Sequence, residues 1–530
     1  MARLPEIGGD AIIRPVPSLN EVSIRLHPED DVVVLKLPVA AGAVFDFPDG
    51  RREVRQAAGR GHKLAAHALP AGAPVRKYGQ VIGFARSDIA AGDLVHTHNL
   101  VLRDVSRDYE FGTDIRPLAP VAAGDEREFL GFTRPDGRAG TRNYLAVISS
   151  VNCSASVSQY VKARFSLEEL RRDFSNVDGV LAFTHKSGCC VQPGEPHAML
   201  QRVLAGVARH PNVFGYVMIG LGCEGHQVSG IRADGKLDQL RPGEPMPSFL
   251  NIQQQGGVRK TVEAAVAAVA KLLPIANAVK RTPQPLSKLV LALNCGGSDG
   301  ASGITANPAL GVASDEIVRR GGTSVLAETP EIYGAEHLLT RRALTREIGE
   351  QLLTHIRWWE QYVKLFGASI DNNPSPGNKE GGLTTIYEKS LGALAKGGQA
   401  PLSAVYNYAE PINRPGFAFM DTPGFDPVSM TGLVCGGANV GVFTTGRGSV
   451  YGCKPAPCIK VATNTTLYDW MRDDMDLNAG TILDGTETVE QVGHRIFEEI
   501  LAVANGKRTK SEAQGLGDEE FAPWILGPTF

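Results

Sequence analysis

The sequence predicts an α/β protein, with a small N-terminal all-β module followed by two parallel-sheet α/β domains. Its 530 residues are enough for several domains. Residues 23–102 contain short β-type segments separated by tight turns, and strand-like apolar runs then alternate with helical stretches. Several of these runs end at glycines and polar residues, as strands do when a ligand site lies at their carboxyl ends.

The composition is that of a soluble globular protein, with 43% hydrophobic and 21% charged residues. A net charge of −3 and a pI near 6.5 argue against nucleic acid or an anionic membrane surface as a partner. No apolar run approaches the roughly 18 residues of a membrane span, and the N-terminus lacks the apolar core of a signal peptide. We therefore expect a cytoplasmic protein whose eight cysteines do not form a disulfide framework.

The N-terminal third is expected to contain an arm at residues 1–20, the β module at 21–105 and a charged linker at 106–128. Residues 31–35 and 77–85 are strand-like, and turns separate them. Two polar clusters lie in the module, at residues 61–63 and 96–99. His96 and His98 are two residues apart, so on a strand they would share a face and could bind one metal ion. The alternative is that they are ordinary surface residues.

The first α/β domain is expected at residues 129–280. Its strands are predicted at 144–148, 180–183 and 214–219, and its helices at 156–167 and 261–273. These strands run into Cys153, Cys189 and Cys223, respectively. Because the carboxyl ends of parallel strands meet at one edge of a sheet, these cysteines are expected there.

A linker at residues 281–285 is expected to lead into the second α/β domain, at 286–510, and a tail at 511–530. Strands are predicted at 289–293, 324–327, 417–421 and 440–443, and helices at 309–320, 335–366 and 489–505. The first strand ends at Cys295, and Gly296 and Gly297 then allow a sharp bend close to a ligand. Residues 373–379 contain two prolines and are expected to form a rigid loop that suits ligand contacts, with a plain surface turn as the alternative.

Four cysteines thus follow predicted strands, and this repetition indicates a shared pocket. The alternative is packing, because free cysteine is a common buried residue. Cys453 and Cys458 lack a zinc-site spacing and are interpreted as structural, and the role of Cys190 is open.

Several short motifs, taken together, resemble one known family, that of the altronate and galactarate dehydratases, which are sugar-acid hydro-lyases. The resemblance covers residues 22–526 and is closer to the altronate branch, which the motifs at 96–99 and 330–336 resemble. It implies an N-terminal SAF-type domain, similar to a β-clip, and a divalent metal, most often Fe²⁺. The motifs lie at residues 61–63, 77–79, 222–224, 295–299, 305–308, 373–379 and 445–448.

The implied reaction removes water from a 2,3-dihydroxy acid, best matched by D-altronate, to give a 2-keto-3-deoxy acid. It needs a base, an acid and a group that stabilises an enediolate. Thiolates and imidazole are suitable ligands for iron. Imidazole also titrates near neutral pH, so histidine can act as the acid or the base. A guanidinium group binds a carboxylate through a fork of hydrogen-bond donors. Glu224, Asp299 or Glu328 could complete an open metal site. The candidates are His62, His185, Lys63 and Lys379 for catalysis; Asn143, Ser298, Asp299, Asn307, Asn378 and Arg447 for substrate binding; and Cys153, Cys189, Cys223, Cys295 and His62 for the metal.

Other functions remain open at this stage. Cys190 and residues 449–458 depart from the family pattern, so galactarate or another hexarate is an alternative small-molecule substrate. A sulfo-lyase acting on a sulfonated hydroxy acid is a second alternative, since related two-part enzymes share these motifs. A non-catalytic carbohydrate-binding protein is a third. The oligomeric state is open, with a homodimer among the alternatives, and the β module is hypothesised to contribute His62 to the site.

Overall fold

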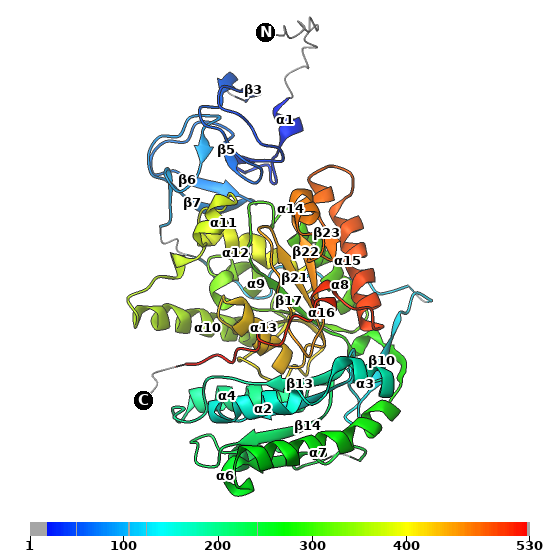
Figure 1. Cartoon of the computed structure of the whole chain (residues 1–530). Coiled ribbons are helices and arrows are strands. Elements are labelled where there is room, and N and C mark those ends of the chain that lie inside the picture. Colours follow the sequence, from blue (N-terminus) through cyan, green and yellow to red (C-terminus); the bar gives the residue numbers. More distant parts are fainter. Residues whose placement is uncertain (1–17, 49, 104–106, 123, 241, 527–530) are drawn as a thin grey trace, which may run out of the picture. The chain divides into compact units, whose positions relative to one another are not determined.

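The computed structural model describes residues 18–48, 50–103, 107–122, 124–240 and 242–526, which form two compact units divided after Val101. The predicted α/β architecture with an N-terminal β-rich region is confirmed (Figure 1). Of the predicted N-terminal arm, residues 1–17 lie outside the described residues.

The first unit is built from short antiparallel strands. Its core contains apolar side chains that alternate along the strands, such as Phe45 and Phe47. His96 and His98 lie in the turn between β8 and β9, so the prediction that they share a strand face is wrong. The elements are α1 (Leu19–Val22), β1 (Ser23–Ile24), β2 (Val32–Leu35), β3 (Val44–Phe47), β4 (Gly50–Glu53), β5 (Lys63–Ala65), β6 (Pro74–Lys77), β7 (Gln80–Ala85), β8 (Leu94–Val95) and β9 (Leu100–Val101).

In the second unit, a four-stranded parallel sheet has the order β13-β12-β14-β15. Buried residues fill β12 and β13, as expected for parallel strands covered on both faces. The strands are β12 (Tyr144–Ser149), β13 (Gly179–Phe183), β14 (Val213–Gly220) and β15 (Ser248–Asn251). The helices are η1 (Asn152–Ser154), α2 (Ala155–Lys162), α3 (Leu167–Asp173), α4 (Glu195–Ala208), α5 (Val228–Asp234), α6 (Ile252–Gln255) and α7 (Val258–Ala278).

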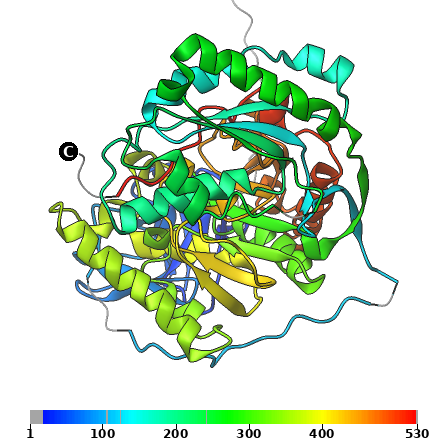
Figure 2. The ribbon, with the colours of Figure 1, turned by 90° about the horizontal axis from the view of Figure 1, so that it is seen from below.

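Helix α7 is the one helix among the described residues that is long and apolar enough to cross a membrane. It runs along the outer face of the four-stranded sheet, as Figure 2 shows, and Val262, Val269 and Leu273 pack into a core with that sheet. A core helix of this kind passes the same length and composition test, so α7 is weak evidence for a membrane span.

A small antiparallel sheet with the order β11-β10-β16 precedes the larger parallel sheet. It contains β10 (Glu128–Thr133), β11 (Ala139–Gly140) and β16 (Arg281–Pro285). The prediction of a linker at residues 281–285 is wrong, because this segment pairs along its length with β10. Its two prolines mimic a linker in the sequence, but proline is tolerated on an edge strand, which β16 is in this sheet.

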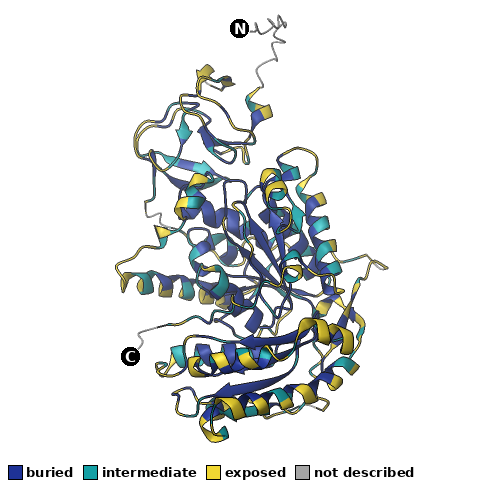
Figure 3. Ribbon diagram, viewed as in Figure 1, coloured by how far each residue is buried: buried dark blue, intermediate teal, exposed yellow. Residues whose placement is uncertain are grey.

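The larger sheet has seven parallel strands in the order β19-β20-β18-β17-β21-β22-β23. Its central strands are fully buried, as the dark strands of Figure 3 show. The strands are β17 (Val290–Cys295), β18 (Thr323–Leu326), β19 (Leu402–Tyr406), β20 (Gly416–Met420), β21 (Val440–Thr445), β22 (Cys458–Ala462) and β23 (Leu477–Asn478).

Helices cover both faces of this sheet, with α13 packed on β17 and α8 on β18 and β20. The helix predicted at residues 335–366 is interrupted, because residues 341–345 separate α9 from α10. The helices are η2 (Leu286–Lys288), α8 (Ala306–Arg319), η3 (Thr329–Glu331), α9 (Glu336–Thr340), α10 (Arg346–Lys364), η4 (Ile370–Asn372), α11 (Pro376–Glu380), α12 (Ile386–Leu394), η5 (Ala395–Gly397), α13 (Asp426–Cys435), α14 (Thr465–Trp470), η6 (Gly480–Ile482), α15 (Val489–Ala504) and α16 (Lys510–Ala513).

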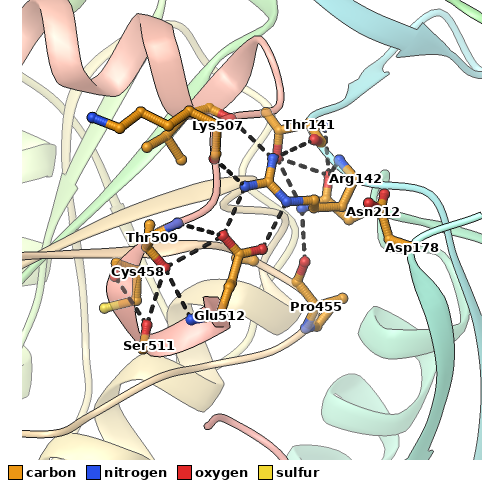
Figure 4. A network of polar contacts seen from close by, with 12 residues as sticks. Thr141, Arg142, Asp178, Asn212, Pro455, Cys458, Lys507, Thr509, Ser511 and Glu512 are labelled. Carbon is orange, nitrogen blue, oxygen red and sulfur yellow. Dashed lines mark hydrogen bonds and ion pairs between the residues drawn. The ribbon is translucent and has the colours of Figure 1, made fainter. Parts of the chain in front are cut away.

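A buried ion pair joins the start of the four-stranded sheet to the C-terminal helices. The Arg142 guanidinium, 2% exposed, donates to both carboxylate oxygens of Glu512 at 2.7 and 2.8 Å. It also donates to the carbonyls of Thr141 and Lys507 (Figure 4) and to that of Val503. Burial raises the pKa of Glu512, but Arg142 outweighs it and holds that pKa below its usual value.

Substitution of Arg142 by leucine is expected to destabilise the second unit by about 3–5 kcal/mol, because it leaves the Glu512 carboxylate buried without its partner. Thermal unfolding measures the effect. Arg172, paired with Asp173 on the surface, provides the matched control, and its leucine variant should melt at nearly the same temperature as the wild type. Equal melting temperatures for the Arg142→Leu variant and the wild type would contradict this prediction.

Candidate active site

Three potential metal ligands meet at the carboxyl edge of the seven-stranded sheet. Cys295 is the last residue of β17, Glu328 follows β18, and Glu331 ends η3. One ligand atom from each lies within 4.8 Å of those of the other two, and all three residues are buried. In the described ranges, this is the one group of three such residues with that spacing.

The backbone around these residues is shaped for close approach. Gly296 has no room for a side chain, because a Cβ there would overlap the Asp426 carboxylate and the Phe443 ring. Glu328 adopts φ +71°, a left-handed conformation that is costly for a residue other than glycine. Its N–H donates to the Thr422 hydroxyl at 2.9 Å, which helps to hold this conformation. Strain of this kind concentrates at functional sites, so it marks Glu328 as a functional candidate.

The two glutamates have unused oxygen atoms. Both carboxylate oxygens of Glu328, and Oε2 of Glu331, are buried without a hydrogen-bond partner among the described residues. Burial, and then the charge of Glu331, raise the pKa of Glu328 well above its usual value. A buried carboxylate without partners is costly, and a bound cation would offset that cost.

Two buried lysines stand beside these ligands. The Lys396 ammonium donates to Cys295 Sγ at 2.7 Å and lies 3.7 Å from Glu328 Oε2. The Lys389 ammonium donates to Glu331 Oε1 at 2.7 Å and to Asn373 Oδ1 at 2.9 Å. Burial lowers the pKa of both lysines, but the neighbouring thiol and carboxylates outweigh it, so both pKa values are raised. Both groups therefore carry positive charge.

A third carboxyl group, that of Asp426 at the start of α13, lies close by. Burial, and then the charge of Glu331, raise its pKa to about 7. Asn294 donates to it at 3.4 Å. With all three carboxyl groups ionised, Glu328, Glu331 and Asp426 would carry one more negative charge than the two lysines balance, and the raised pKa values of Glu328 and Asp426 reflect this excess. Ionised Cys295 would add another negative charge. The donor set therefore fits a divalent cation, and a sulfur ligand favours iron or zinc over magnesium.

The loop after Cys295 contains other residues predicted for the substrate. The Ser298 hydroxyl is buried and has no hydrogen-bond partner in the part of the chain that the structure describes. The Asp299 carboxylate accepts hydrogen bonds from Ser302, Thr463 and the Ala301 N–H. The Ser298 hydroxyl is therefore available to a ligand, whereas the hydrogen bonds of the Asp299 carboxylate stabilise the loop.

Two predicted asparagines also hold the structure together. Asn307 donates to the Gly392 carbonyl at 2.9 Å and accepts from Thr444 at 2.6 Å. Asn378 donates to the Ser298 carbonyl at 2.8 Å, so α11 positions the backbone of the loop. Arg447 is half-exposed and pairs with Glu380 at 3.3 Å. Lys379 lies on α11 and is partly buried.

The four thiols predicted to share a pocket divide between two sheets. Cys153, Cys189 and Cys223 follow strands of the four-stranded sheet, whereas Cys295 ends a strand of the seven-stranded sheet. Hence the first three do not join the Cys295 group.

Two other candidates from the first α/β domain have structural partners. His185 Nε2 donates to the Ser149 carbonyl, and its Nδ1 accepts from the Ser187 N–H. Burial lowers the pKa of His185 to about 4, which keeps the ring neutral at neutral pH. Asn143 lies before β12, at the opposite end of the strand from the cysteines, and donates to the carbonyls of Asn176 and Ala276.

The β module places its candidates beside its own histidine cluster. His62 lies before β5, and its ring stacks on that of His96 with the centroids 5.6 Å apart. Lys63 is buried within β5.

Sequence reasoning missed Glu331, Lys389, Lys396 and Asp426 as members of the site. The two lysines are seven residues apart in a run that is otherwise rich in alanine, glycine and leucine. Seven residues are about two helical turns, so two charges on one side of an apolar segment were a usable signal. Glu331 and Asp426 had no comparable signal, since isolated acidic residues are common.

A buried set of acidic, thiol and ammonium groups at the carboxyl edge of a parallel sheet defines an enzyme of the α/β class with a candidate metal centre. Family models then match the whole sequence of domains. The altronate/galactarate dehydratase SAF domain matches residues 21–103, the second domain of D-galactarate dehydratase/altronate hydrolase matches 131–277, and the C-terminal domain of D-galactarate/altronate dehydratase matches 286–529. The chain belongs to the altronate and galactarate dehydratase family and is a hydro-lyase.

Individual relatives agree with this assignment. Altronate dehydratase of Escherichia coli is 37% identical over 492 residues, covering 92% of this chain and 96% of the relative. Galactarate dehydratase (L-threo-forming) of the same organism is 37% identical over 501 residues, or 94% and 95% of the two chains. The beta subunit of (2R)-sulfolactate sulfo-lyase from Chromohalobacter salexigens is 32% identical over 400 residues, or 74% of this chain and 96% of the relative.

Proposed function

We propose that this enzyme dehydrates D-altronate to a 2-keto-3-deoxy sugar acid and water, with Fe²⁺ bound by Cys295, Glu328 and Glu331. The observation that supports this proposal best is the buried group of three ligands with unused carboxylate oxygens. The choice of altronate follows the relatives named altronate dehydratase and the resemblance of residues 96–99 and 330–336 to that branch. The free thiols of the chain are consistent with a cytoplasmic enzyme.

The reaction removes the proton at C2 and the hydroxyl group at C3, so negative charge develops on an enediolate. A divalent cation in this site would supply Lewis-acid stabilisation of that charge. Lys389 and Lys396 hold two fixed positive charges within the same buried site, and such preorganised charges stabilise an anion strongly in a water-poor environment. The Ser298 hydroxyl is available to hold a substrate hydroxyl.

A keto-acid assay tests the substrate and the metal together. Altronate, galactarate and glucarate are compared with anaerobically purified protein, with and without added Fe²⁺ and with a chelator. We expect keto acid from altronate at the highest kcat/KM, and its loss with the chelator and recovery with Fe²⁺. If protein free of bound transition metal turned over altronate at the same rate with and without chelator, the metal centre would be disproved. A higher kcat/KM for another acid would disprove the substrate assignment.

The second candidate function is a sulfo-lyase, which the similarity to the sulfolactate sulfo-lyase beta subunit favours. Sulfite release from a sulfonated 2-hydroxy acid measures it directly. We expect no sulfite above the background rate, because dehydration releases water rather than sulfite. Sulfite release faster than keto-acid formation from any hexonate would favour this alternative.

A further inference from the structure

The exposed cysteines of this protein are not scattered over its surface. All eight cysteines lie in the described residues, where Cys295, Cys435, Cys453 and Cys458 are buried and the other four are exposed. The exposed ones are Cys153, Cys189, Cys190 and Cys223, and all four follow strands of the four-stranded sheet. Free cysteine is normally among the most buried residues, so a group of exposed cysteines at one sheet edge indicates a ligand-binding site.

Backbone hydrogen bonds tie the three cysteine-bearing loops together. The Asn152 N–H donates to the Ser187 carbonyl at 2.9 Å, which joins the first loop to the second. The Gly225 N–H donates to the Cys189 carbonyl at 2.8 Å, which joins the third loop to the second. A side chain at Gly188 would lie 2.5 Å from the Ser150 carbonyl oxygen, so the loops are packed too closely for one. The fold therefore fixes the backbone of the loops from which the three thiols project.

The thiols are also neighbours, because Cys153, Cys190 and Cys223 all lie close enough to Cys189 to act on it electrostatically. Yet the sulfur atoms of Cys153, Cys189 and Cys223 do not all lie within 4.8 Å of one another. Thiolates on a single tetrahedral ion lie closer, since a metal–sulfur bond of about 2.3 Å places two sulfurs about 4 Å apart. Neighbouring thiols with a wider spacing suit a group larger than one ion.

The surroundings fit such a group. Gln253 Nε2 donates to Cys223 Sγ at 3.3 Å, and hydrogen bonds to ligand sulfurs are typical of iron–sulfur sites. The neighbouring Glu224 carboxylate is not available as a ligand, because it accepts from Ser150 and from the N–H groups of Leu221 and Gly222. His226 Nδ1, in the third loop, is buried without a partner in the described part of the chain.

From this geometry we propose that Cys153, Cys189 and Cys223 bind an iron–sulfur cluster of the [4Fe–4S] class, separate from the Cys295 centre. Each ligand comes from a different strand end, so the cluster would join three loops. The three thiolates bind three irons and leave the fourth for a non-cysteine ligand. Cys190 is adjacent to Cys189 and is not one of the three ligands. This proposal does not depend on the substrate or on the role of Glu331.

Iron and acid-labile sulfide in anaerobically purified and reconstituted full-length protein test the proposal. We expect about four acid-labile sulfides and about five irons per chain, the fifth iron being that of the Cys295 centre, together with broad visible absorbance that bleaches with dithionite and an EPR signal in the reduced state. Iron without labile sulfide, or zinc alone after reconstitution, would overturn the proposal.

Variants locate the ligands without any need for turnover. Serine at Cys153, Cys189 or Cys223 should abolish labile sulfide while thermal unfolding stays cooperative. Serine at Cys190, or at the buried Cys453, should leave iron and sulfide unchanged, and loss of the cluster in Cys190→Ser would overturn the three-ligand assignment. Glu331→Gln should retain the cluster, so failure of the proposed catalytic centre is distinguishable from failure of this one.

Discussion

Replacement of Glu331 by glutamine is expected to lower turnover of the sugar acid about a thousand-fold, the equivalent of about 4 kcal/mol of transition-state stabilisation. Glutamine preserves the shape and can still accept from Asn373 and Lys389, as Glu331 Oε1 does. It removes the charge and the unpartnered carboxylate oxygen Oε2, which would bind the proposed cation. Metal content by mass spectrometry and steady-state kinetics measure the two consequences, and both should fall together.

Glu316 provides the matched control for this substitution. It is a buried glutamate on α8, paired with Arg319 and Arg320 and outside the metal group. Glu316→Gln should reduce thermal stability but leave metal content and kcat within about twofold of the wild type. The assignment of Glu331 fails if Glu331→Gln binds metal and turns over like this control.

Replacement of Lys396 by methionine is expected to lower kcat by about 10²–10³, the range found when one preorganised group that stabilises an oxyanion is removed. The positive charge lies 2.7 Å from Cys295 Sγ and 3.7 Å from Glu328, within a site whose carboxylates outnumber its ammonium groups. Its loss would leave negative charge uncompensated in the site where the proposed reaction forms an enediolate. Metal should still bind, because the three ligands remain, so kcat is expected to fall more than metal occupancy.

Two further variants distinguish an electrostatic role of Lys396 from a structural one. Lys396→Arg retains the charge and should recover part of the lost kcat, which a purely structural role would not predict. Lys460 is also fully buried and donates to the Tyr451 carbonyl, away from the metal group, so Lys460→Met measures the cost of burying a methionine in place of lysine. A kcat for Lys396→Met within threefold of that of Lys460→Met would refute the electrostatic role.

The architecture was predictable because its signals are local. Buried parallel strands appear as apolar runs, and glycines follow them where the backbone must turn, as Gly296 does after Cys295. The errors also have local causes. Residues 281–285 contain two prolines and resemble a linker, yet pairing with β10 makes them an edge strand. Residues 341–345 carry a helix-like pattern, but the chain turns there between α9 and α10.

The site was predictable only in part. Cys295 and Ser298 were found from the strand that delivers them, and Glu328 was recognised as a carboxylate at the end of another strand. Lys389 and Lys396 come from a segment about a hundred residues further along the chain, and Asp426 begins yet another helix. Their role depends on which helices cover the carboxyl edge of the sheet.

The sequence by itself determined the α/β class, the strand that ends at Cys295, the family and the residue types from which a metal site is made. Only the tertiary structure decided how those residues are grouped. It separated Cys153, Cys189 and Cys223 from Cys295, because the two sets follow strands of different sheets. It also brought Glu328, Glu331, Lys389 and Lys396 around Cys295. The physical reason is one of range. Periodicity and turn chemistry depend on residues that are close in the sequence. A buried charged site is stable only when each desolvated group finds a partner, and only the packed fold brings those partners together.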